Sequence, residues 1–222
     1  VAVFDKALDS AVRLVQATYG YKQDGVISSD LVKELNVSAE ARLQQILINM
    51  QRMHWIPTEP EGKLIVVNIP EFMLHVQEAK SDVFNMPIVV GKEGTNTVLF
   101  SGKLNQVVFS PYWNLPESIV QNEILPAIEK DKDYLAKHEM EITGERDGLP
   151  VIRQLPGDKN QLGKIKFLFP NSYNIYFHDT PYKGLFEKDK RAYSHGCIRL
   201  SDPVKLAEYL LRDEGEWDYA KI

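Results

Sequence analysis

The sequence of 222 residues contains a single cysteine, Cys197, so the chain cannot form an internal disulfide. It has no run of about 18 apolar residues, which argues against a membrane-spanning helix. It also has no sustained basic stripe, and its net charge of −5 argues against a nucleic-acid-binding protein. Because 44% of the residues are hydrophobic, the chain can bury a core in one large domain or two small ones.

The sequence begins at Val1 and shows neither an initiator methionine nor a basic and apolar leader. We expect either a trimmed cytosolic protein or a protein whose export signal and anchor have been removed. The cysteine count does not distinguish these two compartments, because a lone cysteine has no internal partner.

The first part of the sequence has the periodicity of α-helices. Apolar residues recur at spacings of three and four from residue 4 to residue 15, which predicts a helix that ends near Gly20. A further capped helix is predicted from Ser38. We therefore expect a helical unit over residues 1–36 and a helical connector over residues 37–62.

A domain boundary follows, because Pro57, Pro60 and Gly62 break the helical pattern. From Lys63 the apolar residues alternate with a period of two, as in β-strands. Short strands are predicted at residues 64–69, 72–76, 87–91, 98–100 and 106–109. Many short strands with regular turns predict a sandwich or an open barrel. We expect an α+β chain whose mainly-β domain spans residues 63–222.

Residues 117–148 interrupt the strands with an acidic segment that has a helical pattern between Ile119 and Ile128. The segment contains nine acidic and four basic residues, whereas residues 183–205 contain six basic and three acidic ones. On charge alone the segment is a solvated helical surface. The alternative is a mobile cap that accompanies the basic segment.

The cysteine lies in the run Ser194-His195-Gly196-Cys197-Ile198-Arg199-Leu200. A thiolate is a strong nucleophile once a neighbouring base or positive charge lowers the pKa of the thiol. Gly196 permits a tight turn in which successive N–H groups can bind an oxyanion. A second histidine, His178, ends a predicted strand nineteen positions upstream of Cys197 and can serve as a base.

Two non-catalytic roles for the cysteine remain open at this point. A single cysteine is most often a small buried hydrophobic residue. His178, His195 and Cys197 are also the ligand types of an open three-ligand zinc site. The sequence offers neither a second cysteine nor a His-x-x-x-His pair in support of such a site, so we expect no metal.

The run at residues 194–200, with His178-Asp179-Thr180 upstream, resembles the active-site signature of the L,D-transpeptidase family, which has a YkuD-type catalytic domain. The segment at residues 110–116 resembles the Tyr-Trp-Asn-x-Pro segment that borders the catalytic cleft of that family. Residues 4–36 resemble the peptidoglycan-binding repeat of cell-wall enzymes.

The larger members of the family also resemble this chain in two further segments. Asn49-Met50-Gln51-Arg52 followed by Trp55-Ile56-Pro57 is similar to their connector, and the insertion at residues 117–148 lies where they carry a capping insertion. The resemblance therefore implies a mainly-β catalytic domain with an N-terminal helical unit and a helical capping insertion.

The resemblance implies acyl transfer on the stem peptides of peptidoglycan. Cys197 would attack an L,D bond of a donor tetrapeptide and expel D-alanine, and an amine of a neighbouring stem would resolve the thioester into a 3→3 cross-link. His178 would act as general base and later acid, or as an imidazolium that lowers the pKa of Cys197. His195 would have a supporting role, and the backbone of Gly196 would belong to the oxyanion hole.

The substrate contacts expected from the sequence are Ser194, Arg199, Trp113, Asn114 and Tyr176. Arg199 either binds a substrate carboxylate or pins its loop to Asp202 or to a backbone carbonyl. Asp179 is adjacent to His178 on a strand, so its side chain points to the opposite face. We therefore expect a backbone carbonyl to orient the histidine.

The same site also fits an L,D-carboxypeptidase, with water as the acceptor, or an enzyme that attaches proteins to the wall. A third alternative is a non-catalytic wall-binding scaffold built on residues 4–36. The implied chemistry needs no cofactor, and we expect a monomer whose partners are stem peptides. Because peptidoglycan lies outside the inner membrane, we expect the periplasm or cell envelope, a role in cell-wall biogenesis and cell shape, and acylation by carbapenems.

Overall fold

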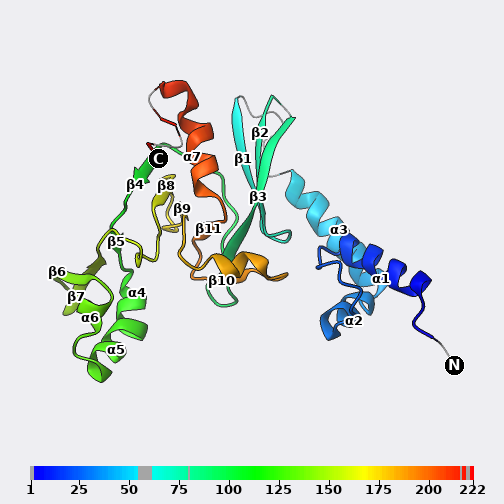
Figure 1. The fold of residues 1–222 in the computed structure, drawn as a ribbon, viewed down its shortest axis with the longest axis horizontal. Coiled ribbons are helices and arrows are strands. Elements are labelled where there is room, and N and C mark those ends of the chain that lie inside the picture. Colours follow the sequence, from blue (N-terminus) through cyan, green and yellow to red (C-terminus); the bar gives the residue numbers. More distant parts are fainter. Residues whose placement is uncertain (1–2, 55–61, 80, 216, 219–220) are drawn as a thin grey trace. The chain divides into compact units, whose positions relative to one another are not determined.

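The computed structural model describes residues 3–54, 62–79, 81–215, 217–218 and 221–222 (Figure 1). The chain folds into two compact units, residues 1–66 with 75–84 and residues 67–74 with 85–222. The connector segment Trp55-Ile56-Pro57 and the predicted break at Pro60 lie outside the described residues.

The helices are α1 (Lys6–Thr18), α2 (Ser29–Leu35), α3 (Ala39–Met53), α4 (Glu117–Ile119), α5 (Leu125–Lys130), α6 (Tyr134–Lys137) and α7 (Pro203–Leu211). The strands are β1 (Lys63–Asn68), β2 (Met73–Glu78), β3 (Ser81–Gly91), β4 (Gln106–Phe109), β5 (Trp113–Asn114), β6 (Met140–Arg146), β7 (Leu149–Gln154), β8 (Ile165–Leu168), β9 (Phe177–His178), β10 (Ala192–Ser194) and β11 (Ile198–Leu200). A π-helix spans Val120–Ile124, and 3₁₀-helices span Lys183–Glu187 and Arg212–Glu214.

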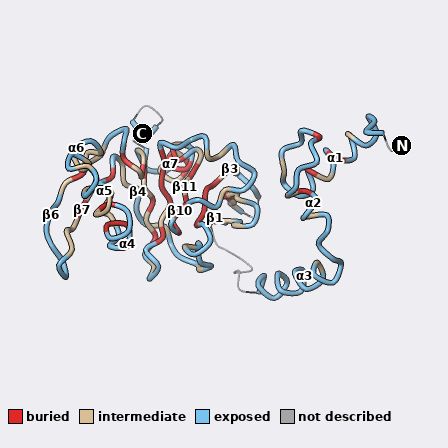
Figure 2. The backbone as a smooth tube through the Cα atoms, turned by 90° about the horizontal axis from the view of Figure 1, so that it is seen from below, coloured by how far each residue is buried: buried red, intermediate tan, exposed pale blue. Residues whose placement is uncertain are grey.

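The N-terminal helices form where their caps predict them. Asp5, Ser28 and Ser38 each accept a hydrogen bond from the N–H three residues later, at the starts of α1, α2 and α3. Gln16 is buried, and its amide group holds the turn at Asp24 and Gly25 to α1. Figure 2 shows that most of this region is exposed, and α3 has no buried residue.

The large sheet has the strand order β1-β2-β3-β11-β9-β8-β4, with β10 paired to β3. Strand β11 is antiparallel to β3 and parallel to β9, so the two predicted catalytic segments are neighbours in the sheet. Residues 98–100, predicted as a strand, lie in an irregular segment. Just before it, the hydroxyls of Thr95 and Thr97 donate to the carbonyls of Ser194 and Gly196. The segment around residues 95–100 therefore supports the loop before Cys197 and does not extend the sheet.

Apolar side chains from β2, β3, β8, β9, β11 and α7 form the core around the sheet. In Figures 1 and 2, α7 lies against β11. Asp202 caps α7 at its first turn and Pro203 occupies its first position, as the sequence predicts. The fully buried members of the core include Leu74, Ile88, Val89, Ile165, Phe167, Leu200, Leu206 and Ala207. This packing fixes β11, which begins directly after Cys197.

The insertion differs from the helical segment predicted over residues 117–148. It is helical as far as Lys137 and then forms β6, which pairs with β7 in a hairpin, and β7 pairs with β5 in a separate sheet of order β5-β7-β6. Asp147 and Gly148 turn the hairpin, and both have positive φ. The insertion has a small core of its own, made of Ile119, Val120, Ile124, Met140 and Ile152.

Candidate active site

The register of the central strands brings the predicted base and nucleophile to one face of the sheet. Arg199 on β11 is opposite His178 on β9, which in turn is opposite Lys166 on β8. The N–H of Ile198 donates to the carbonyl of Tyr176, 3.1 Å away, so the alternation continues to Cys197. Tyr176 and Cys197 therefore lie on the same face, with His178 diagonal to the cysteine.

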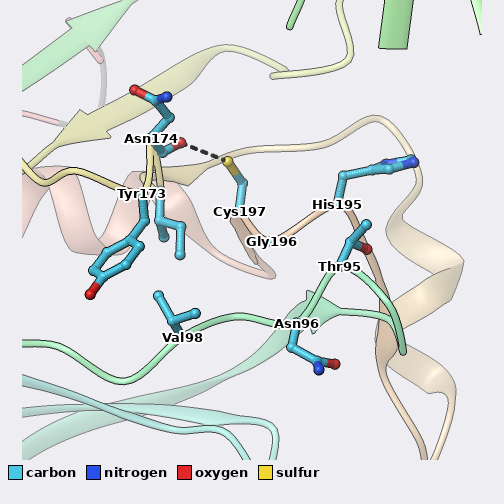
Figure 3. A pocket seen from close by; sticks show the side chains of 9 residues that line it. Thr95, Asn96, Val98, Tyr173, Asn174, His195, Gly196 and Cys197 are labelled. Atoms are coloured by element: carbon cyan, nitrogen blue, oxygen red, sulfur yellow. Dashed lines mark hydrogen bonds between the residues drawn. The ribbon is translucent and has the colours of Figure 1, made fainter. Parts of the chain in front are cut away.

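Cys197 is half-buried and lines a pocket of about 280 Å³. Its thiol donates to the carbonyl of Asn174, with 3.6 Å between sulfur and oxygen (Figure 3). Asn174 has a φ of 56°, a left-handed conformation that asparagine tolerates better than most residues. Cys197 is only partly buried and lines the pocket, so a substrate can reach its sulfur.

The loop before Cys197 is held by hydrogen bonds from two threonines. Thr97 donates to the carbonyl of Gly196 at 2.8 Å and accepts from the N–H of Gly91 at 3.0 Å. Thr95 donates to the carbonyl of Ser194 at 3.2 Å. Gly196 has a φ of +112°, which a side chain would strain, so glycine is required for this turn.

Two residues of this loop that the sequence assigns to the site, Ser194 and Gly196, hydrogen-bond within the loop itself. Ser194 is buried, and its hydroxyl donates to the carbonyl of Cys197 at 2.5 Å and accepts from the N–H of Gly196 at 3.1 Å. Ser194 therefore shapes the loop. Because the N–H of Gly196 is already bound, it is not a free oxyanion donor.

Burial raises the pKa of the Cys197 thiol above its ordinary value. Hydrogen bonds from the backbone and the hydroxyl of Tyr176, and the positive charges of Lys166 and Arg199, act in the opposite direction. Burial dominates, so the thiol is neutral at physiological pH. The surrounding donors and cations favour the thiolate once the proton leaves.

His178 is also neutral, because burial and then the positive charge of Arg199 lower its pKa to about 3. Its Nδ1 is 2.5 Å from the backbone carbonyl of Asp179, the type of orienting partner that the sequence predicts. A carbonyl can only accept, so Nδ1 carries the proton and Nε2 keeps its lone pair. A resting thiolate–imidazolium pair, one of the two roles expected for His178, is therefore not the favoured state.

The carboxylate of Asp179 has partners of its own, away from the imidazole. It accepts from the N–H of Lys164 at 2.9 Å and from Nζ of Lys183 at 2.6 Å. Gly163 packs so closely that a Cβ there would lie 2.3 Å from the carboxylate. These contacts fix the end of β9, and with it the carbonyl that orients His178.

Tyr176 links the thiol to the insertion. Burial and then the neighbouring Cys197 raise the pKa of its hydroxyl, whereas the side chain of Trp113 lowers it. Trp113 in turn packs against the core of the insertion. The Tyr-Trp segment predicted to border the cleft therefore reaches the thiol through Tyr176, whereas Asn114 is exposed.

Two cations lie beside the thiol. Nζ of Lys166 is 3.9 Å from the centre of the Tyr176 ring, and burial lowers the pKa of this lysine. Nε of Arg199 is buried, with no hydrogen-bond partner among the described residues. Asp202, the partner suggested for Arg199, instead caps α7 by accepting from the N–H of Lys205. Lys166 was not predicted from the sequence. Its neighbours on β8, Ile165 and Phe167, are buried, so strand alternation places Lys166 on the opposite face, where it pairs with His178.

His195 lines the same pocket, but its ring points away from the sulfur in Figure 3. Its Nε2 is 3.1 Å from Oε1 of Glu123, on the π-helix of the insertion. The acidic insertion therefore meets the basic loop at this contact, and the pairing of these two residues was not predicted from the sequence. His138, in the same insertion, is half-buried and stacks on Tyr134 at 4.0 Å.

The zinc site considered from the sequence has no support in the described part of the chain. No group of three or more His, Cys, Asp or Glu side chains is arranged there to hold a metal ion. Nor is any helix among those residues long and apolar enough to cross a membrane.

The family profile of the L,D-transpeptidase catalytic domain, YkuD, matches residues 62–215, well over half of the chain. This chain belongs to the YkuD family of L,D-transpeptidase catalytic domains. The YkuD match includes Cys197, His178 and the whole insertion, and helices α1 to α3 lie before it.

Two relatives give the YkuD assignment its context. A "Putative L,D-transpeptidase" of Haemophilus influenzae is 32% identical over 199 residues, which are 82% of this chain and 39% of that protein. The chain therefore spans well under half the length of this relative. The solved structure of an L,D-transpeptidase from Mycobacterium smegmatis is 15% identical in sequence, and the match covers 68% of this chain and 54% of the mycobacterial chain. The TM-score is 0.39, so this likeness is too distant to bear on the site.

Proposed function

We propose that this chain is a cysteine-dependent L,D-transpeptidase that forms 3→3 cross-links between peptidoglycan stem peptides. One observation carries the proposal: the only thiol of the chain opens into a pocket beside a neutral, oriented imidazole on the same face of the sheet. Two cations and a tyrosine hydroxyl next to the sulfur favour its ionised form. This set of groups fits acyl transfer through a thioester.

In the first step Cys197 attacks the carbonyl of the third residue of a donor tetrapeptide. Nε2 of His178 takes the thiol proton as the C–S bond forms. Because burial and Arg199 disfavour the imidazolium, protonated His178 is a strong acid. It passes the proton to the departing amine, so D-alanine leaves and a thioester remains.

The developing oxyanion needs hydrogen-bond donors close to the sulfur. Tyr176 lies beside Cys197 in the sheet, and we assign its backbone N–H to the oxyanion hole with the N–H of Cys197 itself. The N–H of Gly196 is engaged by Ser194, which supports this assignment over the one made from the sequence. Each such donor contributes roughly 3 to 4 kcal/mol to stabilising the transition state.

The donor peptide carries carboxylates, and the cations beside Cys197 are suited to bind one of them. Arg199 has a buried Nε without a hydrogen-bond partner among the described residues, and a guanidinium binds carboxylates through paired hydrogen bonds. We therefore assign Arg199 to substrate binding, with Lys166 supplying positive charge nearby. Trp113 and Tyr176 form the wall between this charge and the insertion.

In the second step an amine of a neighbouring stem attacks the thioester and restores the thiol.

We also propose that residues 1–36 are a peptidoglycan-binding unit, that residues 37–62 connect it to the catalytic domain, and that the insertion caps the substrate. The protein would then act as a monomer in the cell envelope, outside the inner membrane, where its substrate lies.

The test is incubation of the protein with disaccharide-tetrapeptide fragments of peptidoglycan, followed by separation of the products by mass. The proposal predicts tetrapeptide–tripeptide dimers with 3→3 links, and none with Cys197→Ala at an unchanged melting temperature. Tripeptide products alone, with abundant acceptor present, would indicate an L,D-carboxypeptidase. No new product from a protein whose thiol remains accessible would refute the enzyme function.

A further inference from the structure

Charged groups of opposite sign lie near Cys197 and near His195, two residues that line the same pocket. Lys166 and Arg199 place positive charge beside the sulfur on the sheet face. At the loop side, His195 lines the pocket and contacts the carboxylate of Glu123. The lining side chains of the pocket include no carboxylate in the described part of the chain, and Glu123 places a carboxylate on His195 at this side.

We propose that the Glu123–His195 pair is the acceptor side of the active site, with His195 as the base that takes a proton from the acceptor's ammonium group and Glu123 as its positioning residue. This inference rests on the proposed transpeptidase function and extends it to the second substrate. A primary amine is a cation at neutral pH and attacks a thioester only after it has lost a proton, so the acceptor requires both a negative charge and a base.

The geometry separates this pair from the thiol chemistry. The ring of His195 points away from the sulfur in Figure 3, whereas His178 lies on the face of Cys197. When Nε2 of His195 donates to Glu123, Nδ1 keeps a lone pair and can accept a proton. A carboxylate that orients one imidazole nitrogen also stabilises the imidazolium that forms.

The local fold of the insertion places Glu123 at this position. Glu123 lies in the π-helix between α4 and α5, where Val120 and Ile124 on either side of it are buried in the core of the insertion. Those two residues anchor the turn while Glu123 is exposed. A single π-turn within α-helical segments is a feature often found at functional sites, and here it carries the residue that contacts the nucleophile loop.

The proton balance of the step is complete. The ammonium gives one proton to His195 and the free amine attacks the thioester carbonyl, so that a C–N bond forms and the C–S bond breaks. The second proton of the amine passes through His178 to the Cys197 thiolate, which restores the thiol. The proton on His195 is then released to solvent. The step consumes no oxidant, metal or cofactor.

The test compares the two half-reactions in Glu123→Gln, Glu123→Asp and Glu129→Gln. Glu129 is the matched control, because it is a glutamate on α5 of the same insertion that makes no ion pair with His195. A synthetic tetrapeptide stem serves as donor, and acylation is followed by intact mass. A diamino-acid stem is then titrated as acceptor, and the cross-linked and hydrolysed products are quantified.

We expect donor acylation within about twofold of wild type in all three variants. In Glu123→Gln the ratio of cross-linked to hydrolysed product should fall about tenfold, and the KM for the acceptor should rise. A tenfold change corresponds to about 1.4 kcal/mol of lost interaction with the acceptor. Glu123→Asp should recover part of the ratio, and Glu129→Gln should match wild type.

An unchanged ratio in Glu123→Gln with normal acylation would overturn the acceptor assignment and leave the proposed function standing. A parallel fall of acylation and cross-linking would reduce the ion pair to a structural contact and overturn the assignment too. Failure of every form, wild type included, to acylate would refute the proposed function, and this inference with it.

Discussion

The Nδ1–H of His178 donates a hydrogen bond to the backbone carbonyl of Asp179, with 2.5 Å between nitrogen and oxygen. This contact selects the tautomer in which Nε2 can accept the proton of Cys197. Because burial keeps the imidazole neutral, the proposed base carries no proton on Nε2 across the physiological pH range. The proposed chemistry follows from this arrangement.

The buried, neutral His178 makes stability depend on pH. Its pKa is lowered to about 3 in the folded state and is near 6.5 in an unfolded chain, so between these values only the unfolded state takes up the proton. Stability from this group is therefore full above pH 6.5 and declines as the pH falls toward 3, by at most about 1.4 kcal/mol per pH unit. Denaturant unfolding at pH 7, 6, 5 and 4 should show a steeper decline in wild type than in His178→Gln. Equal slopes would contradict the neutral buried state.

The hydroxyl of Tyr176 should lower the pKa of Cys197 by hydrogen bonding to the thiolate. In Tyr176→Phe we expect that pKa to rise by about one unit, since a hydrogen bond to a charged group is worth about 1.5 to 3 kcal/mol. The rate of alkylation by iodoacetamide against pH measures it directly, because the chain has no other cysteine. Tyr193→Phe, on the exposed part of β10, is the control. A pKa that stays the same or falls would remove Tyr176 from the thiol's environment.

Gly163 should be required for the position of the base. A Cβ at residue 163 would lie 2.3 Å from the carboxylate of Asp179, and the φ of +61° is itself strained for other residues. We expect Gly163→Ala to lower the free energy of unfolding by about 1 to 3 kcal/mol and to slow acylation, because the end of β9 must shift. Gly184→Ala, where a Cβ meets nothing within 4 Å, should change stability by less than about 0.5 kcal/mol. Comparable melting temperatures for the two variants would argue against this packing.

Much of this site could be predicted because its signals are local in the sequence. The run around Cys197 and the strand ending at His178 each carry a readable pattern, and the strand pairing joins them as expected. The caps at Ser38 and Asp202 likewise define helix starts by a side chain and an N–H only three residues apart.

The features that the sequence did not reveal depend on contacts between distant segments. Glu123 meets His195, and Thr97 meets Gly196, only after the sheet and insertion have formed. The bond from Gly196 to Ser194 that removes an expected oxyanion donor is a detail of one tight turn. The β6–β7 hairpin did have a signal, the Asp147-Gly148 turn pair, but the acidic composition of the insertion concealed it.

The most direct test of the central claim is the intact mass of the protein after brief exposure to a tetrapeptide stem donor. The account predicts an adduct equal to the donor minus D-alanine, carried by Cys197, absent in Cys197→Ala and formed at least about 100-fold more slowly in His178→Gln. An adduct that persists in Cys197→Ala would contradict the account. So would a wild-type protein that iodoacetamide alkylates at Cys197 but that the donor never acylates.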